Sequence, residues 1–400
     1  MTRVLPASLF ANPNAIAADY SRFGVADRML LSGHSHQAWP DCGFEGQQKA
    51  WLDAAELVDR KWERAFAKAE RVRDGWRRLL DEPDAEVALG ANTHELVIRL
   101  LSALPLDQRP RIVTTDGEFH TLRRQFDRLE EAGIEIHRVA AEPVDTLAAR
   151  LAQEVDARTA LVGVSCVMFR SAHIVPNLGE LATACARQGS ALLVDSYHAL
   201  NVVPFSVPRQ GLESAFVVGG GYKYCQFGEG NCFLRVPRDC DLRPVITGWY
   251  AEFEALEEKA DGTVKYGRGA GRFAGATYDP TAHYRAASVL DYFEERGLTA
   301  EVLREVSQHQ VGVLADGFDA LDMDPRVIAR DRSAPLANTA GFLALRAEQA
   351  GVVSEALFER GVANDYRDDV LRLGPAPYLS DSQLRAAIEI LGEIIKDVNS

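Results

Sequence analysis

The sequence predicts an α/β fold in which a mainly parallel sheet is covered by helices on both faces. Between residues 111 and 220, apolar segments of strand length alternate with segments that have helical periodicity. This alternation is typical of parallel sheets that are buried on both faces. The predicted strands are RIVTT (111–115), IEIHRVA (134–140), TALVGVS (159–165), ALLVDS (191–196) and SAFVVGG (214–220). The helical segments between them include LRRQFDRLEEAG, PVDTLAARLAQEV and NLGELATACARQG.

The segments on either side of this region predict two domains. A large domain is expected over residues 45–280, and a smaller α/β domain is expected from residues 1–44 together with residues 281–400. The amino-terminal segment looks irregular, and residues 240–280 are loop-like, with scattered glycine among basic and aromatic residues. The other predicted elements are amphipathic helices in 43–80, a helix after VALGANTH, helices at 282–296, 299–321 and 353–360, the strand AGFLALRA, and a carboxyl-terminal helix in SDSQLRAAIEILGEIIKDV.

The composition favours a globular protein that acts on a small molecule. With 400 residues, 47% of them hydrophobic, the chain can bury a large core. Its 44 basic and 58 acidic side chains give a formal net charge of -14, which opposes binding to nucleic acids or to anionic lipid surfaces. We therefore expect neither nucleic acid nor a membrane as a partner.

The amino terminus, the cysteines and the histidines argue against a membrane protein, a disulfide-linked protein and a metal site at His34 and His36. The amino terminus lacks a continuous apolar segment, and no stretch approaches the ~20 apolar residues that span a bilayer, so we expect a cytoplasmic protein. Six cysteines without a CxxC pair indicate reduced thiols. His34 and His36 have a spacing that could bind a metal on a strand, but no third ligand follows at a suitable distance, so no metal site is predicted.

The stretch ALLVDSYHALNVVPFSVPRQGLESAFVVGGGYKYCQFGEGNCFLR (191–235) holds the residues most suited to chemistry. Asp195 ends one predicted strand, His198 follows it closely, and Lys223 comes directly after the glycines that end the next strand. These glycines permit a tight turn, and ligands of parallel sheets bind beyond the carboxyl ends of the strands. Structural alternatives exist for each residue: a helix cap for Asp195, a core position for His198 and a surface turn for Lys223.

Taken together, these residues match the needs of pyridoxal phosphate (PLP). Asp195 can keep the pyridine nitrogen protonated, and a partly buried Lys223 can form a Schiff base with the aldehyde. The phosphate can bind at Thr93, where a helix begins, and at the turn from Gly219 to Tyr222, which includes Gly220. Phe119, with His120 beside it, can cover the ring. The segment GGGYK is not a Walker A loop, because it lacks the first glycine and the hydroxyl residue after the lysine.

At this point the sequence resembles the class V, fold type I PLP-dependent enzymes, and among them the kynureninases. VDSYHALNVVPF and GGGYKY are similar to the Asp-x-x-His and cofactor-lysine segments of that family. VLRLGPAPYLSD resembles the segment whose arginine holds the substrate carboxylate, which implies that role for Arg372. The remaining matches are ANTHEL with Thr93 and His94 at the phosphate, LSGHSHQAWP with His34 and Ser35 at the substrate, TGWY with Trp249 at the cofactor, and FAGATYDP with Thr277. Because Thr277 matches a loop that reaches the cofactor phosphate of the other subunit, the resemblance implies a homodimer with active sites at the interface.

The sequence departs from the kynureninase pattern around the substrate. The serine before Tyr-Lys is Gly221, the amino-terminal asparagine is His34, and an asparagine that contacts the aryl group is Asp279. Cys166 and Arg170 fall in a loop beside the ring, without an assigned role. These differences indicate a pocket that can accept something other than kynurenine.

The resemblance implies hydrolytic cleavage of a carbon–carbon bond in a kynurenine-type amino acid, giving alanine and an aryl acid. Lys223 would act as base and acid, Asp195 would hold the ring, and Arg372 would bind the carboxylate. Tyr222 would bind phosphate or move a proton, and His198 would support Asp195 or the ring hydroxyl. The main alternative is an aminotransferase or another class V reaction. A cysteine desulfurase is disfavoured because no cysteine follows Cys240, and the intact lysine, aspartate and arginine set disfavours a non-catalytic protein.

Overall fold

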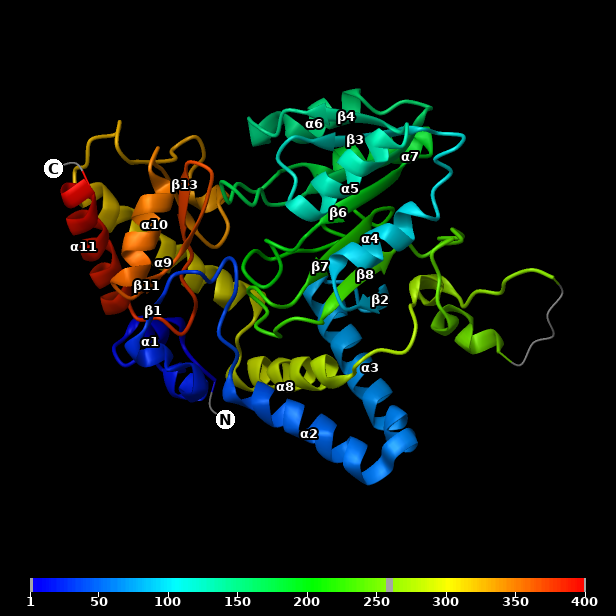
Figure 1. The fold of residues 1–400 in the computed structure, drawn as a ribbon, viewed down its shortest axis with the longest axis horizontal. Coiled ribbons are helices and arrows are strands. Elements are labelled where there is room, and N and C mark those ends of the chain that lie inside the picture. The colour runs from blue at the N-terminus through cyan, green and yellow to red at the C-terminus, as the bar shows by residue number, and fades with distance from the viewer. Residues whose placement is uncertain (1–2, 257–261, 399–400) are drawn as a thin grey trace.

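The structure is a computed structural model that describes residues 3–256 and 262–398 of the chain. Residues 1–2, 257–261 and 399–400 lie outside the described part, so the prediction for residues 240–280 is not covered over its whole length. A large seven-stranded sheet and a smaller four-stranded sheet lie in two neighbouring bodies (Figure 1). Within the described residues, no helix is long and apolar enough to cross a membrane, and no cluster of His, Cys, Asp and Glu side chains could hold a metal ion.

The large sheet confirms the predicted α/β fold. Its strand order is β2-β8-β7-β6-β5-β3-β4, in which the neighbours from β7 to β4 pair in parallel and β8 pairs antiparallel with β2 and β7. The five predicted strands all form, with ends that differ by at most two residues, and β8 is an additional strand. The bounds are β2 Glu86–Gly90, β3 Arg111–Thr115, β4 Glu135–Val139, β5 Thr159–Ser165, β6 Ala191–Asp195, β7 Phe216–Gly220 and β8 Cys232–Val236.

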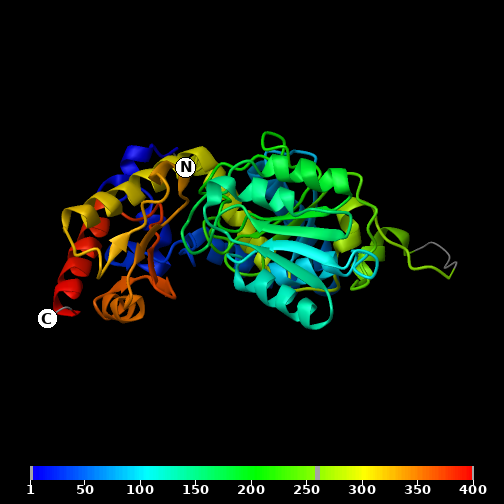
Figure 2. The same ribbon diagram turned by 90° about the horizontal axis from the view of Figure 1, so that it is seen from above.

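Alternate side chains of these strands enter two different cores, because successive residues of a strand point to opposite faces. On β6, Leu193 packs in one core while Leu192 and Val194 pack in the other. Figure 2 shows the helices that cover both faces of the large sheet. The helices from the amino terminus to β6 are α1 Pro6–Phe10, α2 Asp41–Leu57, α3 Trp62–Leu79, α4 Thr93–Leu101, α5 His120–Glu131, α6 Leu147–Gln153 and α7 Leu178–Gln188.

The smaller body combines the carboxyl-terminal part of the chain with the amino-terminal segment. Its antiparallel sheet has the order β12-β13-β10-β9, and β1 of the amino-terminal segment pairs in parallel with β11. The strands are β1 Met29–Leu30, β9 Ala329–Arg330, β10 Leu343–Arg346, β11 Val362–Ala363, β12 Asp365–Arg367 and β13 Val370–Leu373. The helices are α8 Thr281–Arg296, α9 Ala300–Ala320, α10 Ala350–Glu359 and α11 Asp381–Val398. Since α8 packs against α2 and α3, it links the two bodies, and the predicted division at residue 280 stays a proposal.

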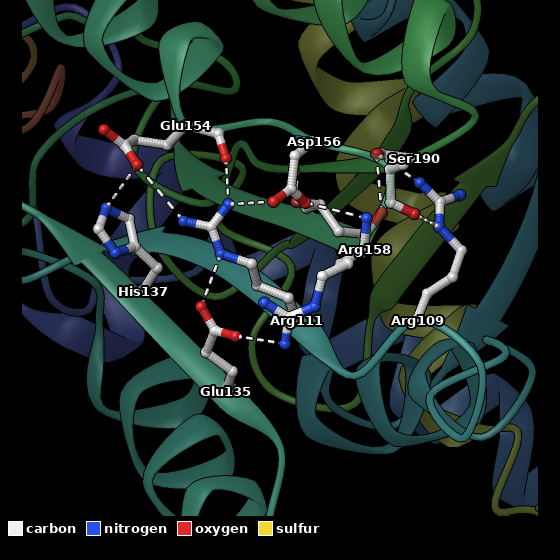
Figure 3. Close-up of polar contacts among 10 residues, drawn as sticks. Arg109, Arg111, Glu135, His137, Glu154, Asp156, Arg158 and Ser190 are labelled. Carbon is white, nitrogen blue, oxygen red and sulfur yellow. Dashed lines mark hydrogen bonds and ion pairs between the residues drawn. The ribbon is translucent and has the colours of Figure 1, made fainter.

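At the amino ends of β3, β4 and β5, a cluster of ion pairs surrounds Arg111 (Figure 3). The Arg111 guanidinium is 2.9 Å from Glu135, 3.3 Å from the Glu154 carboxylate and 3.2 Å from Asp156. The Arg111 side chain is 10% exposed, whereas Arg158, which also pairs with Glu135, is 60% exposed. This cluster lies at the end of the sheet opposite to Asp195, so it belongs to the scaffold of the large body.

Replacing Arg111 with methionine is expected to lower the free energy of unfolding by about 2–4 kcal/mol, because three carboxylates lose a nearly buried partner. The matched variant Arg158→Met should cost less than about 1 kcal/mol, because that pair is exposed to solvent. Denaturant unfolding followed by circular dichroism measures both changes. Equal effects of the two substitutions would contradict this role of Arg111.

Candidate active site

A cavity of about 240 Å³ lies at the carboxyl ends of β5, β6 and β7. The amino terminus of α4, the residues that precede and begin α5, and the segment that follows β7 complete its wall. The lining residues are Ala91, Asn92, Thr93, His94, Phe119, Thr121, Ser165, Val167, Asp195, Tyr197, His198, Tyr222, Lys223, Glu229, Gly230 and Cys232. The structure thus brings seven of the predicted site residues to the edge of the sheet where ligands of this fold bind.

Lys223 is buried in this cavity, which excludes an exposed turn position. Its side chain is surrounded by aromatic rings, with Nζ 4.9 Å from the ring centre of Tyr197 and 5.3 Å from that of Phe119. Burial lowers the pKa of Lys223 to about 7, and the negative charge of Asp195 counteracts part of this shift. A large fraction of Lys223 is therefore a neutral amine near pH 7, the form that attacks a carbonyl carbon.

His198 is the nearest polar neighbour of the lysine. Its Nε2 lies 2.5 Å from Lys223 Nζ, and its Nδ1 is buried without a hydrogen-bond partner among the described residues. Burial, together with the charges of Lys223 and Arg372, holds the pKa of His198 well below its usual range. His198 is therefore neutral and can accept a hydrogen bond from the Lys223 amine.

Asp195 presents a carboxylate at the end of β6. Its Oδ1 accepts a hydrogen bond of 2.9 Å from the backbone N–H of Tyr197, and it forms no ion pair with any described side chain. Burial raises the pKa of Asp195, although the charge of Lys223 acts in the opposite direction. A half-buried carboxylate that lines the cavity and has no ion-pair partner among the described side chains fits the protonated ring nitrogen of PLP.

The amino terminus of α4 offers backbone N–H groups to the cavity. Asn92 caps the helix, since its side-chain oxygen accepts a hydrogen bond of 2.9 Å from the N–H of Glu95. Thr93 and His94, the first two residues of α4, both line the cavity. This end of the cavity has the donors and the helix dipole that suit a phosphate group.

The chain bends directly after β7, as predicted, but the glycines before Lys223 serve close packing and not a left-handed backbone conformation. None of Gly219, Gly220 and Gly221 has a positive φ. A Cβ at Gly220 would lie 2.5 Å from Cys232 Sγ, and one at Gly221 would lie 2.5 Å from the ring of Phe227. Side chains of neighbouring segments occupy the space beside these glycines, so larger residues would displace the segment that carries Lys223.

Arg372 and His34 meet at Asp365, outside the cavity. The Asp365 carboxylate accepts hydrogen bonds from Arg372 Nε at 2.8 Å and Nη2 at 2.5 Å, while Arg372 Nη1 donates to the carbonyl oxygen of Phe169 at 2.6 Å. A guanidinium has five N–H donors. The other two have no acceptor among the described residues, and the side chain is 3% exposed. Ser35 does not join this cluster; its hydroxyl contacts His36.

His34 supports Asp365 as a neutral group. Its Nε2 lies 2.7 Å from Asp365 Oδ1, and its side chain is fully buried. Burial lowers the pKa of His34 to about 4, although the hydrogen bond to Asp365 acts in the opposite direction. The sequence reasoning missed Asp365. The signal was available in DYRDDVLR, because a short hairpin places Asp365 directly opposite Arg372.

The other predicted residues lie elsewhere in the chain. Trp249 and Thr277 contact each other, with 3.2 Å between the indole Nε1 and the Thr277 hydroxyl, and neither lines the cavity. Asp279 accepts hydrogen bonds from the backbone and hydroxyl of Thr281 at the start of α8. Cys166 is buried, which raises the pKa of its thiol, and Arg170 pairs with Asp369 of the smaller body.

Comparisons with known sequences find similarity to kynureninases and to an uncharacterized aminotransferase. A family model described as the kynureninase C-terminal domain matches residues 303–391. A kynureninase of Xanthomonas campestris pv. campestris (strain B100) is 28% identical over 328 residues, which cover 76% of this chain and 75% of that protein. An uncharacterized aminotransferase of Bacillus subtilis (strain 168), YcbU, is 24% identical over 350 residues, which cover 85% of this chain and 87% of that protein.

Solved structures share the fold at lower sequence identity. A structure of a C-DES mutant with glycine covalently linked to its PLP cofactor has a TM-score of 0.80 and 17% identity, covering 94% of this chain and 98% of that one. The apo cysteine desulfurase of Thermococcus onnurineus NA1 has a TM-score of 0.77 and 17% identity, covering 93% and 95%. The chain therefore has the fold that the sequence predicts, which these PLP-dependent enzymes of fold type I share. In sequence it is similar to the kynureninases.

Proposed function

We propose that Lys223 binds PLP covalently and that the enzyme hydrolyses a carbon–carbon bond in a kynurenine-type amino acid, giving alanine and an aryl acid. The observation that carries the proposal is the buried Lys223, with a pKa of about 7, in one cavity with Asp195. Similarity to kynureninases supports the reaction, because the matching family model spans Arg372.

Residues of the cavity fit each part of the cofactor. Asp195 would hold the ring nitrogen, Phe119 would cover the ring, and Thr93 and His94 would bind the phosphate at α4. When bound, PLP supplies an electron sink for bonds broken at the substrate α-carbon. Burial raises the pKa of Tyr222 to about 12, so its hydroxyl stays protonated and can donate a hydrogen bond.

The remaining residues would position the substrate and move protons. The Lys223 amine, released when the substrate amine takes its place, would take and return a proton at the α-carbon, with His198 Nε2 2.5 Å away to orient it. The two free donors of Arg372 would hold the substrate carboxylate, while Asp365 fixes the guanidinium.

An assay with kynurenine tests the reaction. We expect anthranilate and alanine in equal amounts without an added keto acid. The second candidate, an aminotransferase, has the similarity to YcbU in its favour, and it predicts a product that depends on pyruvate. If purified enzyme with the visible absorption of bound cofactor forms no anthranilate, the hydrolase proposal is wrong.

We also propose a homodimer with shared active sites. In the segment between β8 and α8, the described residues on either side of 257–261 extend away from the large sheet in both views (Figures 1 and 2). Its exposed apolar residues are Val245, Ile246, Trp249, Phe253, Leu256 and Val264. A second copy of the chain would cover this surface and bring Thr277 to the other cofactor phosphate.

Mixing two inactive variants tests the shared sites. In the proposed dimer, each active site takes Lys223 from one subunit and Thr277 from the other. A mixed dimer of Lys223→Ala and Thr277→Arg therefore keeps one intact site. Activity should return on mixing, up to about a quarter of the wild-type value, because half of the dimers are mixed. A monomer by light scattering, or no recovery in a proven mixed dimer, would contradict the arrangement.

A further inference from the structure

A buried carboxyl group lies behind the cofactor cavity, at a position that the sequence reasoning did not select. Glu118 is 3% exposed and lies between β3 and α5. Its Oε2 is 2.6 Å from the Ser165 hydroxyl, and its Oε1 accepts hydrogen bonds from the Thr115 hydroxyl at 2.7 Å and from the Ser165 N–H at 3.2 Å. Three neutral donors surround Glu118, and no described cationic side chain forms an ion pair with it.

The charged group that acts most on Glu118 is another carboxylate. Asp195 is the register partner of Ser165 on the adjacent strand, so the two acids lie on either side of this serine. The Cys166 thiol is the other titratable group that senses Glu118, and burial keeps that thiol protonated by raising its pKa. Burial raises the pKa of Glu118 to about 7, although the hydrogen bonds from Ser165 and Thr115 oppose the shift.

Ser165 links Glu118 to the cavity, because it both lines the cavity and bonds Glu118. Its hydroxyl has one proton to donate. When Glu118 is ionised, Ser165 donates to Glu118 and offers the cavity only an acceptor. When Glu118 is protonated on Oε2, Glu118 donates to Ser165, and the Ser165 proton is free to point into the cavity.

We propose that Glu118 is a positioning residue of the cofactor site, which holds a proton while Asp195 is ionised and thereby makes Ser165 a hydrogen-bond donor toward the cofactor. The proposal rests on the role proposed above for Asp195. It assigns Glu118 no contact with the substrate. Protonation of one acid removes the repulsion that two buried carboxylates would otherwise have, which favours the ionised form of Asp195 that a protonated ring nitrogen needs.

Variants of Glu118 and Ser165 separate this role from simple packing. Glu118→Gln keeps the shape of the side chain and a hydrogen-bond donor to Ser165 but cannot ionise. Glu118→Leu has neither the donor nor the ionisable group. Ser165→Ala leaves Glu118 able to ionise but removes the link to the cavity. Glu142→Gln is the matched control, because Glu142 is a carboxylate paired with His173 and has no contact with Ser165.

The readouts are the visible absorption of the bound cofactor as a function of pH, its dissociation constant, and the infrared signal of protonated carboxyl groups. Wild type and Glu142→Gln should show a spectral step and a carboxyl signal that titrate together, and Glu118→Gln should lack both. In Ser165→Ala the carboxyl signal should remain while the spectral step disappears. Glu118→Leu and Ser165→Ala should each weaken cofactor binding about tenfold, as expected for one hydrogen bond, and Glu118→Gln by less than about twofold at pH 6.

The proposal is overturned if Glu118→Gln keeps the spectral step and the carboxyl signal, or if Glu118→Gln and Glu118→Leu weaken cofactor binding equally. Should the Glu118 variants not fold, an unchanged spectral step in Ser165→Ala would overturn it alone. These measurements need no substrate, so they test the role of Glu118 even if the enzyme does not cleave kynurenine. A missing cofactor band in wild type would instead contradict the proposed cofactor site.

Discussion

Replacing Lys223 with alanine is expected to abolish the visible absorption of bound cofactor and to lower kcat by ~10³-fold or more, because both the covalent link and the proton carrier disappear. Absorption spectra and initial rates of the purified variant measure the two effects. Lys49→Ala on α2 is the matched control, because this lysine is half exposed and its one ion-pair partner among the described residues is Asp53. An unchanged spectrum of Lys223→Ala would refute the assignment.

The pH dependence of cofactor binding gives an independent check of the same lysine. Because burial lowers the pKa of Lys223 to about 7, the neutral amine decreases as the pH falls below that value. The rate at which the apoenzyme recombines with PLP should therefore fall about tenfold per pH unit below pH 7 and level off above it. A rate that still rises steeply above pH 9 would indicate a lysine with an ordinary pKa.

Replacing Arg372 with methionine is expected to lower kcat/KM by ~10²–10³-fold, mainly through KM, because two charge-assisted hydrogen bonds to the substrate carboxylate are lost. Steady-state kinetics measures the change. Arg346→Met on the neighbouring strand β10 is the control, since Arg346 is an arginine with a 69% exposed side chain. Similar KM values for wild type and Arg372→Met would contradict the role.

Asp365 should show its effect through Arg372. Asp365→Asn keeps the shape but removes the charge that holds Nε and Nη2 of Arg372, so an increase of about tenfold in KM is expected. In the double variant with Arg372→Met, the Asp365 substitution should add little, because the group that it positions is gone. Additive effects would mean that Asp365 acts independently.

The sequence was informative wherever local pattern decides structure. Apolar runs separated by helical segments predicted β3, β5 and β6 almost to the residue. The position of Lys223 directly after a buried strand predicted where the cavity lies. The structural features that the sequence could not predict depend on contacts between distant segments of the chain. The pairing of β8 with β2, the link from Glu118 to Ser165 and the packing of Phe227 against Gly221 join positions that no local periodicity relates.

The residues of the candidate active site also divide into those that the local sequence predicts and those that it does not. Asp195, Lys223 and Phe119 were accessible because each carries a chemical group that PLP requires at a strand end or in the loop that follows one. Glu118 was missed because an acid between a strand and a helix resembles an ordinary turn residue until its burial is known. Trp249 and Thr277 contact each other away from the cavity of their own chain, and the role proposed for Thr277 depends on a second subunit.

The central claim is that Lys223 carries the cofactor. Reduction of the purified enzyme with borohydride, followed by proteolysis and mass spectrometry, tests it most directly, because reduction makes the lysine–cofactor bond permanent. We expect one phosphopyridoxyl group per chain, on the peptide that contains Lys223. A phosphopyridoxyl group on another lysine, or an unmodified Lys223 peptide from enzyme that shows cofactor absorption, would contradict the account.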